Sequence, residues 1–144
     1  MTNQSNPEKQ AEKMVGNEVV KKKPPKIEDK SFDEFINKHL IPEIKNEFKI
    51  LNLDLNIIEL KQTERPVVGG DCWLLFGEFE SSKRFWISFE TNNITSKKYI
   101  CLSDSKSLPD VLESFLIDEK KMTLKLLTSR LMQRLNGQKW LGEN

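Results

Sequence analysis

The fold of this chain is decided by residues 72–89, which begin Cys72-Trp73-Leu74-Leu75-Phe76-Gly77-Glu78-Phe79. This run is mostly apolar and ends in the polar turn Glu80-Ser81-Ser82-Lys83. Apolar residues then recur at every second position, at Phe85, Ile87 and Phe89. A side-chain period of two is typical of a strand with one buried face. The sequence therefore predicts two strands joined by a turn.

Two further strands are expected, one on each side of this pair. Leu53, Leu55 and Ile57 alternate with polar residues and predict a strand over about 53–61. A short strand is expected over 98–102, after a turn rich in asparagine. Four strands with short connections make an antiparallel meander.

The segment before the sheet has the pattern of an amphipathic helix. Ser31 and Glu34 have the spacing of a capping box. Apolar residues then follow helical spacing, at Phe32, Phe35, Ile36 and Leu40. Pro42 either kinks this helix or begins a second short one, and the pattern continues to about Lys49.

A second capping box at Ser107 and Asp110 opens the segment after the sheet. Helical spacing predicts a helix from there to about Leu135, with a break near Asp118. Asn136-Gly137 suits the C-terminal end of such a helix.

The order of elements is helix, four strands, helices, which predicts an α+β fold. We expect a four-stranded antiparallel sheet with an N-terminal helix and C-terminal helices packed on one face. The other face carries Trp73 or Trp86, depending on register, and an exposed Trp there would be a candidate contact surface.

Length and composition narrow the function classes. The 144 residues fit one domain. No apolar run reaches the roughly 18 to 20 residues of a membrane span, so an integral membrane protein is excluded. The net charge of +1 does not indicate a nucleic-acid binder. Two cysteines and one histidine are too few ligands for a zinc or iron–sulfur site.

Residues 1–30 differ from the rest in composition. They contain no aromatic residue, and hold seven lysines and five acids. Such a segment buries too little apolar surface to offset the entropy of ordering it, so we expect a disordered lysine-rich tail before a single domain at 31–144. Lys21-Lys22-Lys23 could tether the chain to an acidic surface or anionic lipid, but the nearby acids favour a solubilising tail.

No catalytic constellation is found, and we expect neither an enzyme nor a bound cofactor or metal. Cys72 and Cys101 could form a disulfide if their strands were neighbours, but the pattern favours buried apolar fillers. His39 lies near an apolar helix stripe, where packing or capping is favoured over catalysis. Gly69-Gly70 lacks the spacing of a dinucleotide site.

The net charge of the chain is nearly neutral, but the charges are distributed unevenly along the sequence. Residues 31–118 carry 10 basic and 15 acidic side chains, whereas 119–144 carry 6 basic and 2 acidic ones. An apolar stripe in the second segment comprises Leu124, Leu127, Leu131 and Leu135. Basic candidates for partner binding flank it: Lys120, Lys121, Lys125, Arg130, Arg134 and Lys139. They would either steer an acidic partner or, near a helix C-terminus, stabilise the helix dipole.

Trp140 is a further candidate for partner binding. It lies five residues from the end of the sequence, with glycines on both sides. It is either folded back into the core, which is slightly favoured, or offered to a partner. Because it is the only aromatic residue in the basic stretch, binding to nucleic acid is not expected.

Two stretches carry a family resemblance: Leu112-Glu113-Ser114-Phe115-Leu116-Ile117-Asp118-Glu119 and Arg134-Leu135-Asn136-Gly137-Gln138-Lys139-Trp140-Leu141-Gly142. With Lys26-Ile27-Glu28-Asp29-Lys30-Ser31-Phe32 and Cys72-Trp73, they resemble subunit V of the photosynthetic NAD(P)H dehydrogenase-like (NDH) complex of cyanobacteria and plastids. This family is also described as a domain of unknown function. The likeness covers roughly residues 26–144.

The resemblance implies a non-catalytic peripheral subunit on the cytoplasmic or stromal side of the thylakoid membrane. That complex passes electrons from ferredoxin to plastoquinone and supports cyclic electron flow around photosystem I. The subunit would stabilise the ferredoxin-docking region beside subunits S and I. It would carry no cofactor of its own.

Two other functions compete with this one. A small-ligand carrier would enclose a cavity of roughly 300 Å³ or more between helix and sheet. An RNA-associated module would show a strong dependence of binding on salt.

Overall fold

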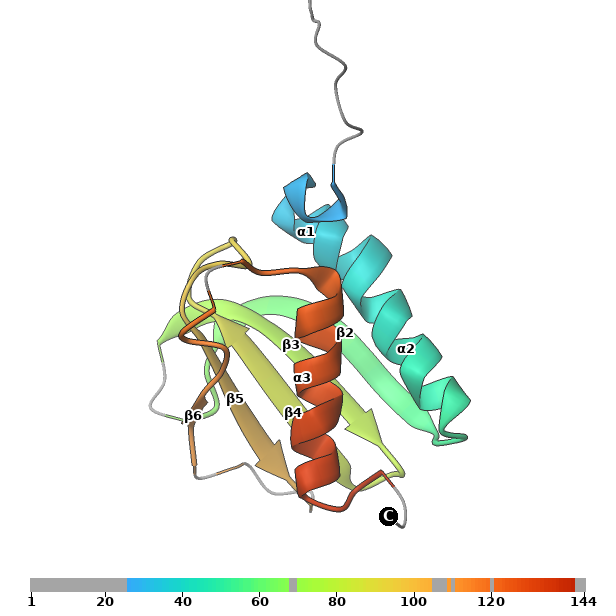
Figure 1. Ribbon diagram of the computed structural model, residues 1–144. Coiled ribbons are helices and arrows are strands. Elements are labelled where there is room, and N and C mark those ends of the chain that lie inside the picture. The colour runs from blue at the N-terminus through green and yellow to red at the C-terminus, as the bar shows by residue number, and fades with distance from the viewer. Residues whose placement is uncertain (1–25, 68–69, 105–108, 110, 120, 142–144) are drawn as a thin grey trace, which may run out of the picture.

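The structure, a computed structural model, describes residues 26–67, 70–104, 109, 111–119 and 121–141. The chain forms an antiparallel sheet with helices packed on one of its faces (Figure 1). The predicted α+β class is therefore confirmed, with differences in the number of strands and in the C-terminal helical region.

Consecutive helical segments precede the sheet. They are η1 (Ile27–Asp29), α1 (Phe32–Phe35), η2 (Ile36–Leu40) and α2 (Ile41–Ile50). Pro42 lies in the first turn of α2, and η2 just before it is a π-helix. There the Ile41 N–H donates to the Ile36 carbonyl, five residues back, and this wider turn makes room for the proline ring. The helix thus continues through Pro42.

Residues 26–30 are part of the folded chain, although the sequence assigns them to the tail. They include η1, and Ser31 then caps α1 by accepting a hydrogen bond from the Glu34 N–H at 3.3 Å. The carboxylate of Glu34 lies 3.6 Å from Lys30 Nζ. The predicted boundary at residue 31 is therefore a few residues late. Residues 1–25 lie outside the described part of the chain, so the disordered tail stays a prediction.

Five strands form the sheet in the order β2-β3-β4-β5-β6. They are β2 (Leu55–Glu64), β3 (Asp71–Phe79), β4 (Lys83–Phe89), β5 (Lys98–Ser103) and β6 (Glu113–Ser114). Every neighbouring pair is antiparallel, and Leu75, Ile87 and Ile100 stand side by side on β3, β4 and β5. The four predicted strands are confirmed, and β6 is an addition.

The segment 111–119 is not helical, which corrects the prediction of a helix from Ser107. Glu113 pairs with Ile100 of β5, and the Phe115 N–H donates to the Lys98 carbonyl at 3.0 Å. Leu112 packs on one face of the sheet and Phe115 on the other. An extended chain along the edge of β5 reaches both faces, which a helix would not do. Residues 105–108 and 110, where the predicted capping box falls, lie outside the described residues.

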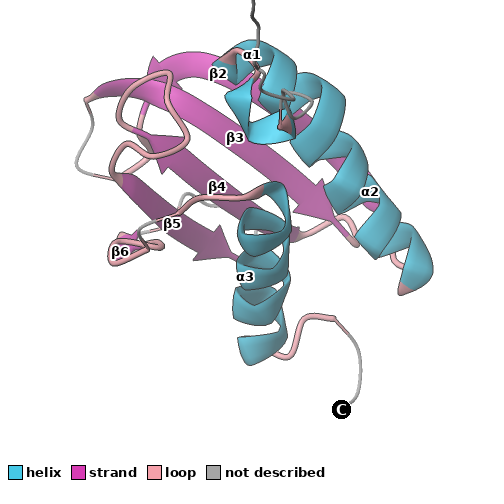
Figure 2. Cartoon of the chain, turned by 45° about the horizontal axis from the view of Figure 1, so that its top comes forward, coloured by secondary structure: helices cyan, strands magenta, loops and turns pink. Residues whose placement is uncertain are grey.

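The core lies between the helices and the inner face of the sheet (Figure 2). α2 and α3 (Leu124–Gly137) lie on this face. The largest side chains with less than 2 % exposure are Phe35, Ile36, Leu40, Ile44, Phe48, Leu75, Phe79, Phe85, Ile87, Phe89, Ile100 and Leu127. The leucine stripe predicted for the last helix is buried at Leu127, Leu131 and Leu135, whereas Leu124 is half-buried.

The outer face of the sheet carries a second apolar cluster. It consists of Cys72, Leu74, Trp86 and Cys101, with Val67, Phe76 and Leu112 packed against it. Trp86 is 6 % exposed, and Arg84 stacks over its ring at 5.3 Å. Trp73 lies on the inner face, where its ring contacts Phe32 at 5.6 Å. Neither Trp is therefore an open contact surface.

Cys72 and Cys101 are buried free thiols, as the sequence favours. Their strands are separated by β4. Burial raises the pKa of both thiols, that of Cys101 to about 11. Both are therefore protonated at neutral pH and act as apolar fillers of the outer face.

Candidate functional site

The described residues that are predicted to bind a partner lie on α3 or next to its ends. This helix begins after Thr123, whose hydroxyl accepts from the Leu126 N–H at 3.0 Å. The carboxylate of Glu28 accepts from the Leu124 N–H at 2.8 Å, which ties the N-terminal segment to the start of α3. This hydrogen bond is the largest cause that lowers the pKa of Glu28. A carboxylate at a helix N-terminus also stabilises the helix dipole.

Arg134 of α3 holds the segment that contains β6. Its Nε and Nη2 donate to the two carboxylate oxygens of Glu113 at 2.9 and 2.7 Å. Its Nη1 donates to Gln138 Oε1 at 3.0 Å. The hydrogen bond from Arg134 is the first cause that lowers the pKa of Glu113. Arg134 therefore positions an edge of the sheet.

Arg130 is also paired with an acid of the same segment, since its Nη2 lies 3.6 Å from Glu119 Oε2. Two of the predicted cations, Arg130 and Arg134, are thus partly neutralised within the chain. Lys125 is exposed on the first turn of α3, and Lys139 is exposed beyond its end. Lys121 is exposed but precedes the helix, which corrects its predicted place on a helical face. Lys120 lies outside the described residues.

Trp140 is folded back into the core. After α3, Lys139 adopts a left-handed conformation with φ of 61°, and the Trp140 N–H donates to the Leu135 carbonyl at 3.2 Å. The Lys139 N–H donates to the Asn136 carbonyl at 2.8 Å, which completes a Schellman motif. The Trp140 ring then contacts Phe79 edge-on at 6.0 Å. The left-handed residue is Lys139, two positions after the predicted cap at Gly137.

A groove runs along the exposed side of α3, and we call it the α3 groove. It combines two hollows, of about 540 Å³ and 630 Å³, which share Ser129 and Met132. The first hollow lies between α2 and α3, and its lining includes Glu43, Glu47, Leu124 and Lys125. The second extends toward the chain end and includes Leu51, Arg130 and Leu141. Apolar and charged side chains of both signs therefore line this surface.

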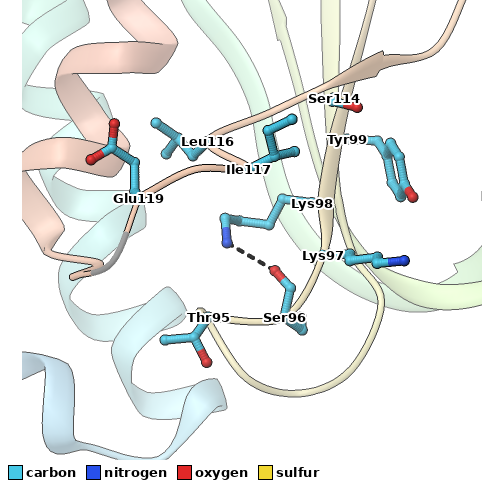
Figure 3. A pocket seen from close by; sticks show the side chains of 9 residues that line it. All are labelled: Thr95, Ser96, Lys97, Lys98, Tyr99, Ser114, Leu116, Ile117 and Glu119. Carbon is cyan, nitrogen blue, oxygen red and sulfur yellow. Dashed lines mark hydrogen bonds between the residues drawn. The ribbon is translucent and has the colours of Figure 1, made fainter.

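A separate pocket of about 340 Å³ lies at the rim of the sheet (Figure 3). Its wall includes Lys98, which is 2 % exposed and donates from Nζ to the carbonyls of Ile94 and Ser96, both at 2.8 Å. Among the described residues, no carboxylate lies within 4 Å of this ammonium group, and desolvation lowers its pKa. Lys98 is not among the residues predicted from the sequence, although its alternation with Ile100 and Leu102 places it on the inner face.

Among the described residues, the histidine and the two thiols lie on different faces of the sheet. His39 belongs to η2 on the inner face of the sheet, whereas both thiols lie on the outer face. Within the described ranges, no group of three or more His, Cys, Asp or Glu side chains could hold a metal ion. In the same part of the chain, no helix has the length and hydropathy needed to cross a bilayer.

We predict that Arg134→Ala and Glu113→Gln each lower the free energy of unfolding by about 1 kcal/mol, because both partners are partly solvent-exposed. Since each change breaks the same contact, the double variant should lose less than the sum. Urea unfolding measures this, with Lys125→Ala, an exposed residue of the same helix, as the control. Additive losses would show that the two side chains do not stabilise each other.

The pair formed by Arg134 and Glu113 should make a pH-dependent contribution to the free energy of unfolding. Because Arg134 lowers the pKa of Glu113, the contribution is complete above the ordinary glutamate pKa. It is lost as the pH falls through the lowered value. The stability difference between the wild type and Glu113→Gln should therefore shrink in acid, and a constant difference would contradict this assignment.

The comparisons with known proteins give one family. The sequence model of DUF2996, described as a protein of unknown function, matches residues 26–142. No curated protein gives a significant match. The matched range includes the N-terminal segment from Lys26, in agreement with the contact between Glu28 and α3.

Proposed function

The chain belongs to the DUF2996 family, and on that premise we propose that it is a non-catalytic peripheral subunit of the thylakoid NDH complex. It would stabilise the ferredoxin-docking region, beside subunits S and I, on the cytoplasmic side of the membrane. The resemblance of residues 112–119 and 134–142 to subunit V supports this assignment. These two stretches are joined by the hydrogen bonds between Glu113 and Arg134, so they form one structural unit.

The observation that carries the proposal is the α3 groove. Its apolar residues, Leu51, Leu124, Met132 and Leu141, remain at least partly exposed beside charged side chains. Protein interfaces combine such an apolar centre with a polar rim. A peripheral subunit needs only a modest contact area, which a groove along one helix supplies. We therefore assign the α3 groove to contact with the neighbouring subunits.

Lysines at the two ends of α3 support a second role, the attraction of ferredoxin. Lys121 and Lys125 lie at its start and Lys139 beyond its end, and all three are exposed. Exposed cations raise the encounter rate with an acidic carrier, and salt screens the effect. Arg130 and Arg134 contribute less, because Glu119 and Glu113 pair with them, and Glu28 interacts electrostatically with Lys121.

Reversal of these three lysines to glutamate should slow ferredoxin-driven plastoquinone reduction severalfold at low ionic strength. The measurement is the initial rate in membranes that lack the native chain and are supplied with the variant. The matched control reverses Lys38, Lys45 and Lys49, which are exposed on the N-terminal helices and give the same change in net charge. Equal rates for both triple variants would remove ferredoxin attraction from the proposal.

A second candidate function is small-ligand binding, and the rim pocket favours it. Among the described residues, the buried Lys98 ammonium group has no carboxylate partner, which is costly, and an anionic ligand would offset that cost. This pocket lies at the rim of the sheet, whereas the cavity expected from the sequence lies between helix and sheet. Native mass spectrometry of the chain isolated from its source should show a retained anion in this case. The mass of the chain alone would exclude a tightly bound ligand.

A further inference from the structure

The border of the sheet formed by β2 offers a long row of backbone groups for pairing. β2 spans Leu55–Glu64 and pairs on one side with β3, and it ends the strand order of the sheet (Figure 2). Its residues from Lys61 to Glu64 are exposed, and Ile57 on the outer face is 41 % exposed. Such a strand is a template for a further strand.

The hydrogen-bond pattern shows which residues face outward. The Arg65 N–H donates to the Gly70 carbonyl at 3.0 Å, in line with the register of β2 and β3. Hydrogen-bonded pairs alternate along an antiparallel ladder. The odd-numbered residues 59, 61 and 63 therefore direct their backbone groups toward β3. Residues 58, 60, 62 and 64 direct theirs to the opposite border, which pairs with no other strand of the described residues and which we call the free border.

The charged side chains on this border favour one antiparallel register for a second β2 over the two neighbouring registers. Glu59 and Lys61 point to the same face, and their charged groups lie 3.2 Å apart. If Leu60 pairs with Leu60 of a second copy, Glu59 faces Lys61 of that copy and Lys61 faces its Glu59. A shift that centres the pairing on residue 59 or residue 61 would instead place like charges opposite each other. Opposite charges stabilise cross-strand pairs and like charges destabilise them.

From this border and its charges, we propose that two copies of the chain associate through β2, with Leu60 at the two-fold axis. The pairing is isologous, and it joins the two sheets into one continuous sheet. The helices of both copies lie on the same side, because the axis is perpendicular to the sheet. The proposal concerns a border other than the α3 groove and does not depend on the proposed function.

The test is the mass of the full-length chain in solution, by light scattering and sedimentation over a range of concentrations. The wild type should show a dimer in equilibrium with the monomer. Lys61→Glu and Glu59→Lys should each weaken dimerisation at least tenfold, because each places like charges opposite one another at two positions. A wild type that stays monomeric at its highest soluble concentration would overturn the proposal.

Two further measurements separate this pairing from a dimer formed elsewhere. The double variant with both reversals should dimerise again, as should an equimolar mixture of the two single variants. Gln62→Pro removes an N–H that faces the free border and should give a folded monomer, whereas Gln62→Ala should remain dimeric. The register centred on Leu60 would be refuted if Lys61→Glu or Glu59→Lys left the dimer unchanged. It would also be refuted if the mixture of these two variants did not associate.

Discussion

Trp140→Ala should lower the free energy of unfolding by about 3–5 kcal/mol. The indole is 9 % exposed and packs edge-on against Phe79 of β3. The Schellman motif directs it there, so its loss leaves a cavity beneath the end of α3. Urea or thermal unfolding monitored by circular dichroism gives the value.

The neighbouring residue provides a control substitution that should not lower the free energy of unfolding. Lys139 has φ of 61°, a conformation that glycine adopts at lower cost. Lys139→Gly should therefore leave stability unchanged or raise it slightly. If Trp140→Ala costs less than about 1 kcal/mol, the chain end is not held in the core.

Gly77→Ala should lower the free energy of unfolding by about 3 kcal/mol. Gly77 lies on the inner face of β3, directly opposite Phe85 of β4. An added Cβ would overlap the Phe85 ring, which is fully buried, so the ring or the strand would have to shift. Phe85 fills the space left by the missing side chain, so the two residues share one site in the core.

A double-mutant cycle tests this explanation. Phe85→Leu alone should be destabilising because it leaves a cavity. In the Gly77→Ala background it should cost less, with a coupling energy of about 1–2 kcal/mol. If the losses of unfolding free energy in the two single variants add up in the double variant, Gly77→Ala acts through the backbone of β3 and not through the Phe85 ring.

The sequence predicts those parts of the fold that depend on local pattern. Alternation identifies β2 to β5, and the leucine stripe at Leu127, Leu131 and Leu135 identifies α3. Burial of Trp140, which the sequence favours, is also confirmed. Each of these signals arises within a few residues of the chain, where a period of two or of 3.6 shows which side is buried.

The parts that were not predicted depend on contacts between distant segments. The helix expected at 111–119 is replaced by β6, because the free edge of β5 and the Arg134 guanidinium lie beside it. Pairing across the sheet outweighs local helix propensity there. The capping of α3 by Glu28, 96 residues away, has no local signal either.

Among the candidate site residues, the sequence identified the cations but not their partners. Composition shows an excess of basic residues in the last segment. It does not show that Glu119 and Glu113 pair with Arg130 and Arg134. The surface that we propose for a partner comprises the α3 groove and the exposed lysines near the ends of α3.

The central claim, that the chain acts by binding other subunits, is tested most directly by affinity purification of the tagged full-length chain from thylakoid membranes. We predict that at low salt the chain copurifies with subunits of the NDH complex, S and I among them, and that rising salt releases it. Recovery of the chain without any of these subunits at low salt would contradict the claim.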